Sequence, residues 1–320
     1  MEKYITLTEW DATAYLIGKA KKNASILEKD ESVTRLVFAD DEIVGDVHYG
    51  EVLSKLFPNV KEFGVKEGSV YLEEGGVLFN KIAQDTIALC AVPWGLSGTY
   101  TVTDFVTRIT TFAFYNSSLS DVTLPEGLLS LDPGAFYGCD HISEIALPVS
   151  LKEMGSWNLA NPFEGCKKLK KINVVKENQY FKVVDGVLYN NLNQLLCYPA
   201  GRGGHMVIPA ECHAVGVGAF CGCNQLTSVA LHGDCSVGNN AFQFCTGLRE
   251  ITLPVGVKWL GRHVFAGCTA LQKIYIEDSA MEFSENFPFA GCSKNLCIYG
   301  HAGSETESYA RRKGFRFEQI

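Results

Sequence analysis

Cysteine and histidine are the residues of this sequence that could most readily bind a metal ion or act in nucleophilic chemistry. The chain has 12 cysteines and 7 histidines. The densest group is Cys221-Gly222-Cys223 with Cys212-His213. Its spacing does not match the Cys-x-x-Cys pairs of zinc sites, and Cys223 also recurs at a fixed repeat position. We therefore expect no metal ion.

The remaining chemistry-bearing residues form no catalytic arrangement. The histidines are scattered, and none shares a recognisable motif with a Ser or Cys nucleophile. The segment 201–204 is glycine-rich, but it lacks the Lys-Ser/Thr pair of a phosphate-binding loop and follows a predicted hairpin. We expect a turn there. The sequence predicts a protein that is not an enzyme, with no catalytic residue and no cofactor.

Half of the cysteines recur at one spacing, which indicates a structural role. Each follows a Phe by three residues, and in the complete copies an apolar residue precedes the Phe by five. The six are Cys139, Cys166, Cys223, Cys245, Cys268 and Cys292. Stacked repeats would place them in a ladder of small, buried thiols, which are usually unreactive. Strand spacing would permit disulfides between rungs, but we expect a reduced cysteine ladder.

A second phrase alternates with the Phe-Cys phrase. It consists of a large apolar residue, two residues, an apolar or β-branched residue, one residue and a final apolar residue, as in Leu271-Ile274-Ile276. The eight clear copies begin at Val33, Val60, Leu119, Ile142, Leu169, Leu226, Leu248 and Leu271, and weaker copies end at Thr103, Ile208 and Ile298. Most steps are 21 to 27 residues, within the range of leucine-rich repeats.

Each phrase predicts a strand that is too short to be stable alone. Its alternating side chains point to two sides, and the strand must stack on the next coil about 4.8 Å away to form a parallel sheet. The Phe of each return segment would fill the layer behind that sheet. The predicted fold is an α/β, mostly β solenoid: a right-handed leucine-rich repeat superhelix with one parallel sheet and irregular or short helical returns.

The domain organisation follows from the extent of the repeat. We predict an N-terminal cap at 1–32, the solenoid at 33–300 and a C-terminal cap at 301–320. Two steps, of 38 and 34 residues, are longer than the others because similar insertions near 75–95 and 183–203 interrupt the repeat. Both insertions have the pattern of β-hairpins.

Each cap has its own local pattern. Near the N-terminus, Tyr4 to Leu7 and Ala14 to Ile17 could pair as a hairpin, or Thr8 could cap a helix instead. Near the C-terminus, Ser304 and Glu307 form a capping box that opens a short helix, and Gly314 ends it. The residues after Gly314 alternate like a last strand.

From residue 33 to residue 320 the chain resembles the BspA-like subclass of the leucine-rich repeat family. The resemblance rests on Ala-Phe-x-x-Cys units at Ala135, Ala219 and Ala241, on strand ends of the Ile-x-Leu-Pro type, on the insertion Asp185 to Asn190 and on the Ile-Tyr-Gly sequence at 298–300. It implies a non-enzymatic solenoid of bacterial or protozoan origin, often secreted or surface-exposed, that binds other proteins or host matrix.

Composition excludes two classes of partner. The chain has 36 acidic and 28 basic residues, a net charge of -8, so we expect no nucleic acid. No window of 18 apolar residues occurs, so we expect no membrane span. The first 20 residues lack the apolar run of a signal peptide. We expect a cytoplasmic monomer on the sequence as given, or a secreted or cell-surface protein if a leader has been removed.

The open face of the predicted sheet is where a binding surface would lie, because outward residues of neighbouring strands form a continuous surface there. These positions have mixed charge and little aromatic character, so no aromatic hot spot is visible. The residues that we predict to bind are Glu62, Asp121, Thr123, Glu144, Lys171, Asn173, Ser228, Glu250, Thr252, Lys273 and Tyr275.

The predicted function is that of a scaffold that binds a protein partner, whose identity the sequence does not give. A surface adhesin or structural spacer of a bacterial cell is one alternative. Binding of a small ligand at a hairpin insertion is another, and a pocket lined by two or more titratable groups would favour it.

Overall fold

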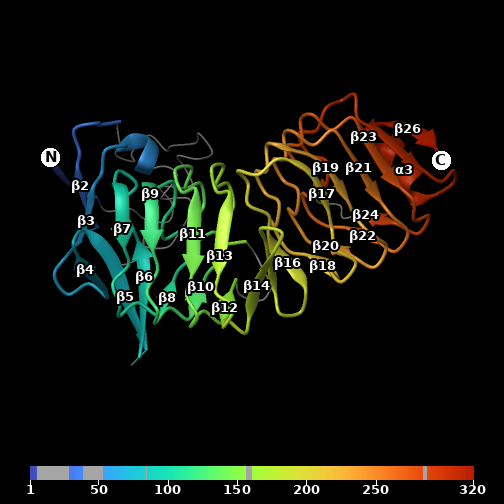
Figure 1. Ribbon diagram of the computed structural model, residues 1–320. Coiled ribbons are helices and arrows are strands. Elements are labelled where there is room, and N and C mark those ends of the chain that lie inside the picture. The colour runs from blue at the N-terminus through green and yellow to red at the C-terminus, as the bar shows by residue number, and fades with distance from the viewer. Residues whose placement is uncertain (6–28, 39–52, 84, 156–160, 284–286) are drawn as a thin grey trace.

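The protein is a solenoid of stacked coils, as the repeat predicts. The computed structural model describes residues 1–5, 29–38, 53–83, 85–155, 161–283 and 287–320. Successive coils lie side by side from the N-terminal end of the molecule to the C-terminal end (Figure 1). The strands are short, and all described strand pairs outside the two insertions are parallel.

One strand of each coil belongs to what we call the front ladder. Its strands are β1 (Glu2–Ile5), β2 (Arg35–Phe38), β3 (Glu62–Val65), β7 (Ser97–Thr101), β9 (Ser118–Thr123), β11 (Glu144–Leu147), β13 (Lys171–Val174), β17 (Gly204–Val207), β19 (Leu226–Ala230), β21 (Glu250–Leu253), β23 (Lys273–Ile276), β25 (Cys297–Gly300) and β26 (Arg316–Gln319). All its pairs are parallel, but it is divided into the sheets β1-β2-β3, β7-β9, β11-β13 and β17-β19-β21-β23-β25-β26.

The return segments also pair, which differs from the irregular returns that we predict. In seven of the returns that the structure describes, two residues form a short strand that pairs in parallel with a neighbouring return, and in six of them the strand contains a buried apolar residue. Leu131, for example, lies opposite Ile109 of one neighbouring coil and Met154 of the other. The return strands are β8 (Arg108–Ile109), β10 (Ser130–Leu131), β12 (Glu153–Met154), β18 (Ala214–Val215), β20 (Ser236–Val237), β22 (Trp259–Leu260) and β24 (Glu282–Phe283).

Stacked aromatic rings fill the layer behind the front ladder. The centroids of Phe220 and Phe242 are 4.9 Å apart and those of Phe242 and Phe265 are 5.4 Å apart. The sequence predicts one column through Phe136, Phe220, Phe242 and Phe265, but the structure has two. Phe114, Phe136 and Phe163 form the first, and Tyr198 begins the second, which continues through Phe220, Phe242, Phe265 and Phe289.

The two insertions are three-stranded antiparallel meanders. The first meander contains β4 (Tyr71–Glu74), β5 (Val77–Ala83) and β6 (Thr86–Ala91), and the second contains β14 (Phe181–Val184), β15 (Val187–Asn190) and β16 (Gln194–Cys197). Asp185 and Gly186, with φ of 48° and 76°, make the first turn of the second meander, where two residues in the left-handed region are needed. The last strand of each meander pairs in parallel with the following return strand.

The ends of the solenoid are covered in different ways. Tyr4 and Ile5 lie in β1, which pairs in parallel with β2, whereas the rest of the predicted hairpin and Thr8 lie outside the described residues. At the other end the predicted Ser304 cap is confirmed: its side chain accepts a hydrogen bond from the Glu307 amide at the start of α3 (Glu305–Lys313). The other half of the predicted capping box differs, because the Glu307 carboxylate accepts a hydrogen bond from the amide of Gly303 and not from that of Ser304. Gly314, with φ of 75°, ends the helix as predicted.

Candidate binding face

The front ladder places all of the predicted binding residues on one face. In β11, for example, Ile145 and Leu147 are buried while Glu144 and Ala146 are exposed. The same alternation recurs in β21. Asn173, Ser228 and Tyr275 are half-buried, and the other eight predicted residues are exposed. Their role in binding stays a prediction.

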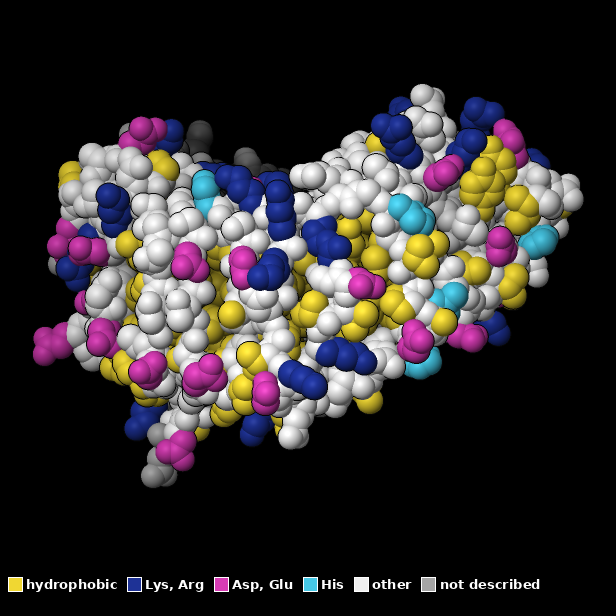
Figure 2. Space-filling model, viewed as in Figure 1, with side chains coloured by type: hydrophobic (Ala, Val, Ile, Leu, Met, Phe, Trp, Pro, Cys, Tyr) yellow, Lys and Arg dark blue, Asp and Glu magenta, His cyan; other side chains and the backbone are white. Residues whose placement is uncertain are grey.

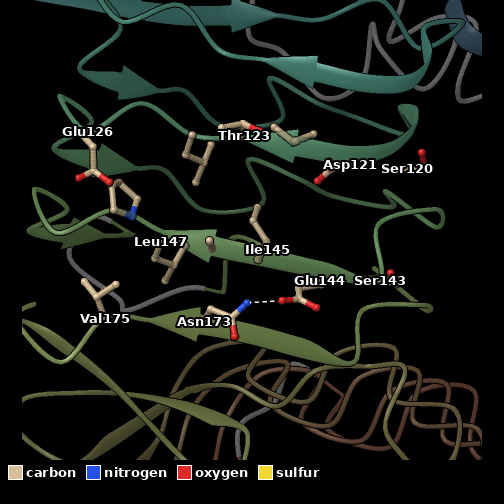
Figure 3. A pocket seen from close by; sticks show the side chains of 14 residues that line it. Ser120, Asp121, Thr123, Glu126, Ser143, Glu144, Ile145, Leu147, Asn173 and Val175 are labelled. Carbon is tan, nitrogen blue, oxygen red and sulfur yellow. Dashed lines mark hydrogen bonds between the residues drawn. The ribbon is translucent and has the colours of Figure 1, made fainter.

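The ladder register joins three of these residues in one polar cluster. Glu144 lies opposite Lys171, whose Nζ is 2.9 Å from Glu144 Oε1. Asn173 Nδ2 donates a hydrogen bond to the same oxygen (Figure 3). These hydrogen bonds, that of Lys171 first, hold the pKa of the Glu144 carboxyl below its usual value. The cluster fixes the orientation of Glu144, although an exposed ion pair of this kind adds little to stability.

The front ladder is interrupted between β9 and β11, where four predicted residues line a hollow of about 520 Å³. Among the described strands, β9 pairs only with β7 and β11 pairs only with β13. Figure 3 shows Asp121 and Thr123 on one side of this hollow and Glu144 and Asn173 on the other. The facing edges of the two strands therefore have backbone groups without a ladder partner.

The hollow is acidic. Asp121, Glu126 and Glu144 line it, and its lining contains no lysine or arginine. Among the residues that the structure describes, Asp121 and Glu126 form no ion pair, so Glu144 alone is neutralised, by Lys171. Elsewhere on the visible side of the molecule acidic and basic side chains are interspersed (Figure 2).

The C-terminal part of the face has an aromatic pair of which only Tyr275 is among the predicted binding residues. Tyr275 stacks on Tyr299 with ring centroids 4.5 Å apart. The predicted repeat phrase ends at Ile298, but the ladder pairs Ile298 with Ile274, in the middle of the phrase. Tyr299 is therefore an outward residue. The Ile-Tyr pair shared by 274–275 and 298–299 is the signal that could have revealed this register.

A smaller correction concerns the repeat that includes β7. The predicted copy of the phrase ends at Thr103, but the ladder pairs Thr101 with Thr123. Val102, which is fully buried, therefore takes the position of Leu124. The error has no effect on the predicted binding residues, because none of them lies in β7.

The cysteine ladder has a function in packing that the spacing alone does not indicate. Each rung donates a hydrogen bond from its thiol to the backbone carbonyl of an aromatic residue in the preceding coil, as Cys139 does to Phe114 at 2.9 Å and Cys268 does to Phe242 at 3.0 Å. Cys166, Cys223, Cys245 and Cys292 do the same. Burial raises the pKa of Cys166 and Cys245, so these thiols stay protonated and are poor nucleophiles.

Two further classes of site are not found in the described part of the chain. No group of three or more His, Cys, Asp or Glu side chains there is arranged to hold a metal ion. None of its helices has the length and hydrophobicity of a membrane span.

Comparison with known proteins gives one family and several similar folds. The model of the BspA type leucine rich repeat region matches 6 copies at residues 99–193 and 204–303, more than half of the chain. No curated protein matches. The pneumococcal vaccine antigen PcpA has a similar structure, with 18% identity and a TM-score of 0.53 over 91% of this chain and 78% of that one.

Two more solved structures share the fold. A leucine rich cell surface protein of Faecalibacterium prausnitzii is 18% identical, with a TM-score of 0.51 over 79% of this chain and 95% of that one. A leucine-rich repeat protein of Eubacterium ventriosum is 20% identical, with a TM-score of 0.50 over 83% of this chain and 78% of that one. At such identities the likeness concerns the fold alone.

Proposed function

Since this chain belongs to the BspA-type leucine-rich repeat family, we propose that it is a non-enzymatic scaffold that binds an extended segment of a partner protein over the hollow between β9 and β11. The observation that supports this most is the interruption of the front ladder at the place where Asp121, Thr123, Glu144 and Asn173 come together.

The backbone supplies the affinity in this proposal. A strand edge without a partner offers N–H and C=O groups that can pair with an incoming extended chain. Two such edges face each other across the hollow between β9 and β11, whereas the six strands from β17 to β26 are joined without a break. An extended segment that lies over the hollow would gain hydrogen bonds to these free backbone groups, and it would find none at the second place.

The side chains supply the selectivity. Asp121 and Glu126 have no ion pair among the described residues, so a lysine or arginine of the partner would complement them. The net charge of -8 would also speed encounter with a basic segment at low salt. We therefore propose a partner segment that is extended and carries at least one basic side chain.

A selection of displayed peptides tests this function even though the natural partner is unidentified. Peptides enriched on the wild-type protein should carry basic residues, and Asp121→Lys should weaken their binding about tenfold or more. Glu153→Lys is the matched control, because Glu153 is also exposed but lies in the return ladder. Binding that survives Asp121→Lys, or that Glu153→Lys weakens equally, would contradict the proposal.

A role at the cell surface is a second proposal, and the family supports it. One protein of similar structure is described as a cell surface protein, and that description applies to that protein. We propose that this chain also acts outside the cell, as an adhesin or as part of a surface layer. Antibody labelling of intact cells of the source organism should detect it, and detection only after lysis would refute this location.

A further inference from the structure

Two cysteines outside the cysteine ladder occupy equivalent positions of consecutive coils. The amide of Cys212 donates to the carbonyl of Pro209, and the amide of Cys235 donates to that of His232. The same turn follows the front strand in eight other described coils. The residue in this position is apolar in five of them, Val106, Leu128, Leu151, Val257 and Met281, and polar in three, Ser69, Asn178 and Ser304. The turn therefore accepts side chains of several kinds, and its geometry does not require a cysteine.

Both thiols are buried, with exposed fractions of 1% for Cys212 and 0% for Cys235. Cys212 donates its thiol proton to the Ala214 carbonyl at 3.3 Å, and Cys235 donates to the Ser236 carbonyl at 3.7 Å. Interaction with the Cys235 side chain lowers the pKa of Cys212, and interaction with Cys212 raises the pKa of Cys235. A more acidic sulfur beside a protonated one is the arrangement of an attacking and a resolving thiol.

A pocket reaches the pair from the side of the second meander. It has a volume of about 370 Å³, and Lys182, Val184, Tyr189 and Asn193 of the meander line it together with Pro209, Glu211 and Cys212. It contains several titratable groups, which is the feature expected of a ligand site at an insertion. Cys212 is among the residues that line the pocket, and Cys235 is not.

The buried hydroxyl of Tyr189 supports the binding of a ligand in this pocket. Tyr189 is only 3% exposed, and its hydroxyl has no hydrogen-bond partner. A buried hydroxyl without a partner costs stability, about 1–3 kcal/mol in measured cases. Tyr189 lies close enough to Cys212 and Cys235 for their charges to affect its own titration. A ligand in the pocket could accept the hydrogen bond that the protein leaves unmade.

We propose that Cys212 and Cys235 form a dithiol site that exchanges with low-molecular-weight disulfides entering the pocket of the second meander. The Cys212 thiolate attacks one sulfur of the disulfide, whose S–S bond breaks, and the first thiolate leaves and takes a proton from water. Cys235 then loses its proton to water and attacks the Cys212 sulfur, which expels the second thiolate. The protein dithiol is oxidised to one disulfide, and the small disulfide is reduced to two thiols.

The cysteine ladder gives an internal contrast. Cys245 and Cys268 also lie in consecutive coils, and each donates its thiol proton to a backbone carbonyl at 3.0 Å, as Cys212 and Cys235 do at longer distances. Burial raises the pKa of Cys245 as well. The pKa of Cys268 is raised too, and neither thiol lines the pocket of the second meander, so they should not exchange.

Mass mapping after treatment with oxidised glutathione tests the site. The folded protein is incubated with the reagent, and free thiols are then alkylated under denaturing conditions. We expect a disulfide between Cys212 and Cys235 and alkylation of the other ten cysteines. Free Cys212 after treatment, or oxidation of Cys245 and Cys268 at the same rate, would overturn the proposal.

Valine variants separate chemistry from folding, because valine occupies this position in two other coils. Cys235→Val should trap glutathione on Cys212, and Cys212→Val should give neither product, while both keep the wild-type circular dichroism. Tyr189→Phe should slow disulfide formation without changing its product. Wild-type rates in Tyr189→Phe, or no adduct in Cys235→Val, would contradict the roles given to these residues.

Discussion

The two parts of the front ladder are built from the same coil but present different surfaces. From β17 to β26 six strands are paired without interruption, whereas β7 to β13 are divided into two separate pairs. Behind both parts lie stacked aromatic rings and the cysteine ladder. The repeated core therefore specifies the fold, and the hollow that we propose as the binding site arises from missing ladder hydrogen bonds, not from a change in the core.

The second meander is where these two parts meet. Its strands send alternate side chains in opposite directions, so that Leu188 and Leu196 belong to the N-terminal core, and Val187 and Leu195 belong to the C-terminal core. Figure 1 shows the front strands on its two sides running at different tilts. The meander thus joins two stacks that each have their own aromatic column.

The largest expected effect comes from an aromatic ring in the C-terminal column. Phe242→Ala should lower the free energy of unfolding by about 3–5 kcal/mol, because the fully buried ring stacks on Phe220 and Phe265. Phe136→Ala should cost a similar amount if the N-terminal column is equally packed. Denaturant unfolding followed by circular dichroism measures both.

Phe244 provides the matched control for that comparison, since its side chain is 48% exposed and lies two residues away. Phe244→Ala should cost less than about 1 kcal/mol. Equal losses for Phe242→Ala and Phe244→Ala would contradict the column as the source of stability.

The next effect is a pH dependence at the boundary between the two stacks. The carboxyl of Glu164 lies against Gly218, and burial raises its pKa from 4.5 to about 7. The folded state therefore holds the proton more tightly than the unfolded state. The contribution of this group to the free energy of unfolding is complete below about pH 4.5. It falls by up to about 3 kcal/mol as the pH rises to about 7.

Chemical denaturation of wild type and Glu164→Gln at pH 4.5, 6 and 8 measures this loss. The variant should show no decline attributable to this group, so the difference between the two proteins should grow with pH. Glu153→Gln, at an exposed position of β12, is the control and should follow wild type. A constant difference between wild type and Glu164→Gln would refute the assignment.

A smaller effect is expected from single rungs of the cysteine ladder. Cys268→Ala removes the hydrogen bond to the Phe242 carbonyl and leaves a small cavity, so it should cost about 1 kcal/mol, and Cys139→Ala should cost the same in the other stack. Cys292→Ala should cost less, because Cys292 is only half-buried. Thermal unfolding ranks the three variants, and a neutral Cys268→Ala would show that the thiol hydrogen bond contributes nothing.

The smallest expected effect is at the exposed polar cluster. Lys171→Ala should leave the denaturation midpoint unchanged, because an exposed ion pair is screened by solvent. It should nevertheless raise the pKa of Glu144 toward its usual value, since the Lys171 hydrogen bond is the main cause of the lowering. An NMR titration of the Glu144 side chain measures this, and an unchanged pKa would show that Asn173 alone orients the carboxylate.

Much of the fold could be predicted because the repeat phrase fixes which side chains face the core. The eight clear copies, the Ser304 helix cap and the exposure of the predicted face residues follow from that pattern. The hollow could not be predicted, since Leu119-Val122-Leu124 and Ile142-Ile145-Leu147 fit the phrase as well as strands that do pair. Ladder hydrogen bonds depend on backbone placement, which the side-chain pattern leaves open.

Other features could be predicted only by comparing one repeat with another, not from single residues. To predict that Tyr299 faces outward, the register of β25 must be known. To predict the break between the aromatic columns, the position of the second meander must be known. Cys212 and Cys235 are 23 residues apart, which is a repeat step, so their equivalence is visible in the sequence. The pocket beside Cys212 becomes apparent only in three dimensions.

Hydrogen–deuterium exchange with a bound peptide tests the central claim most directly. A peptide selected on the wild-type protein should slow exchange of backbone amides in β9 and β11, where the facing edges gain partners. Amides of β19, β21 and β23 should exchange at unchanged rates, because their ladder is already complete. Protection confined to β19–β23 or to the meander tips, with β9 and β11 unaffected, would contradict the account.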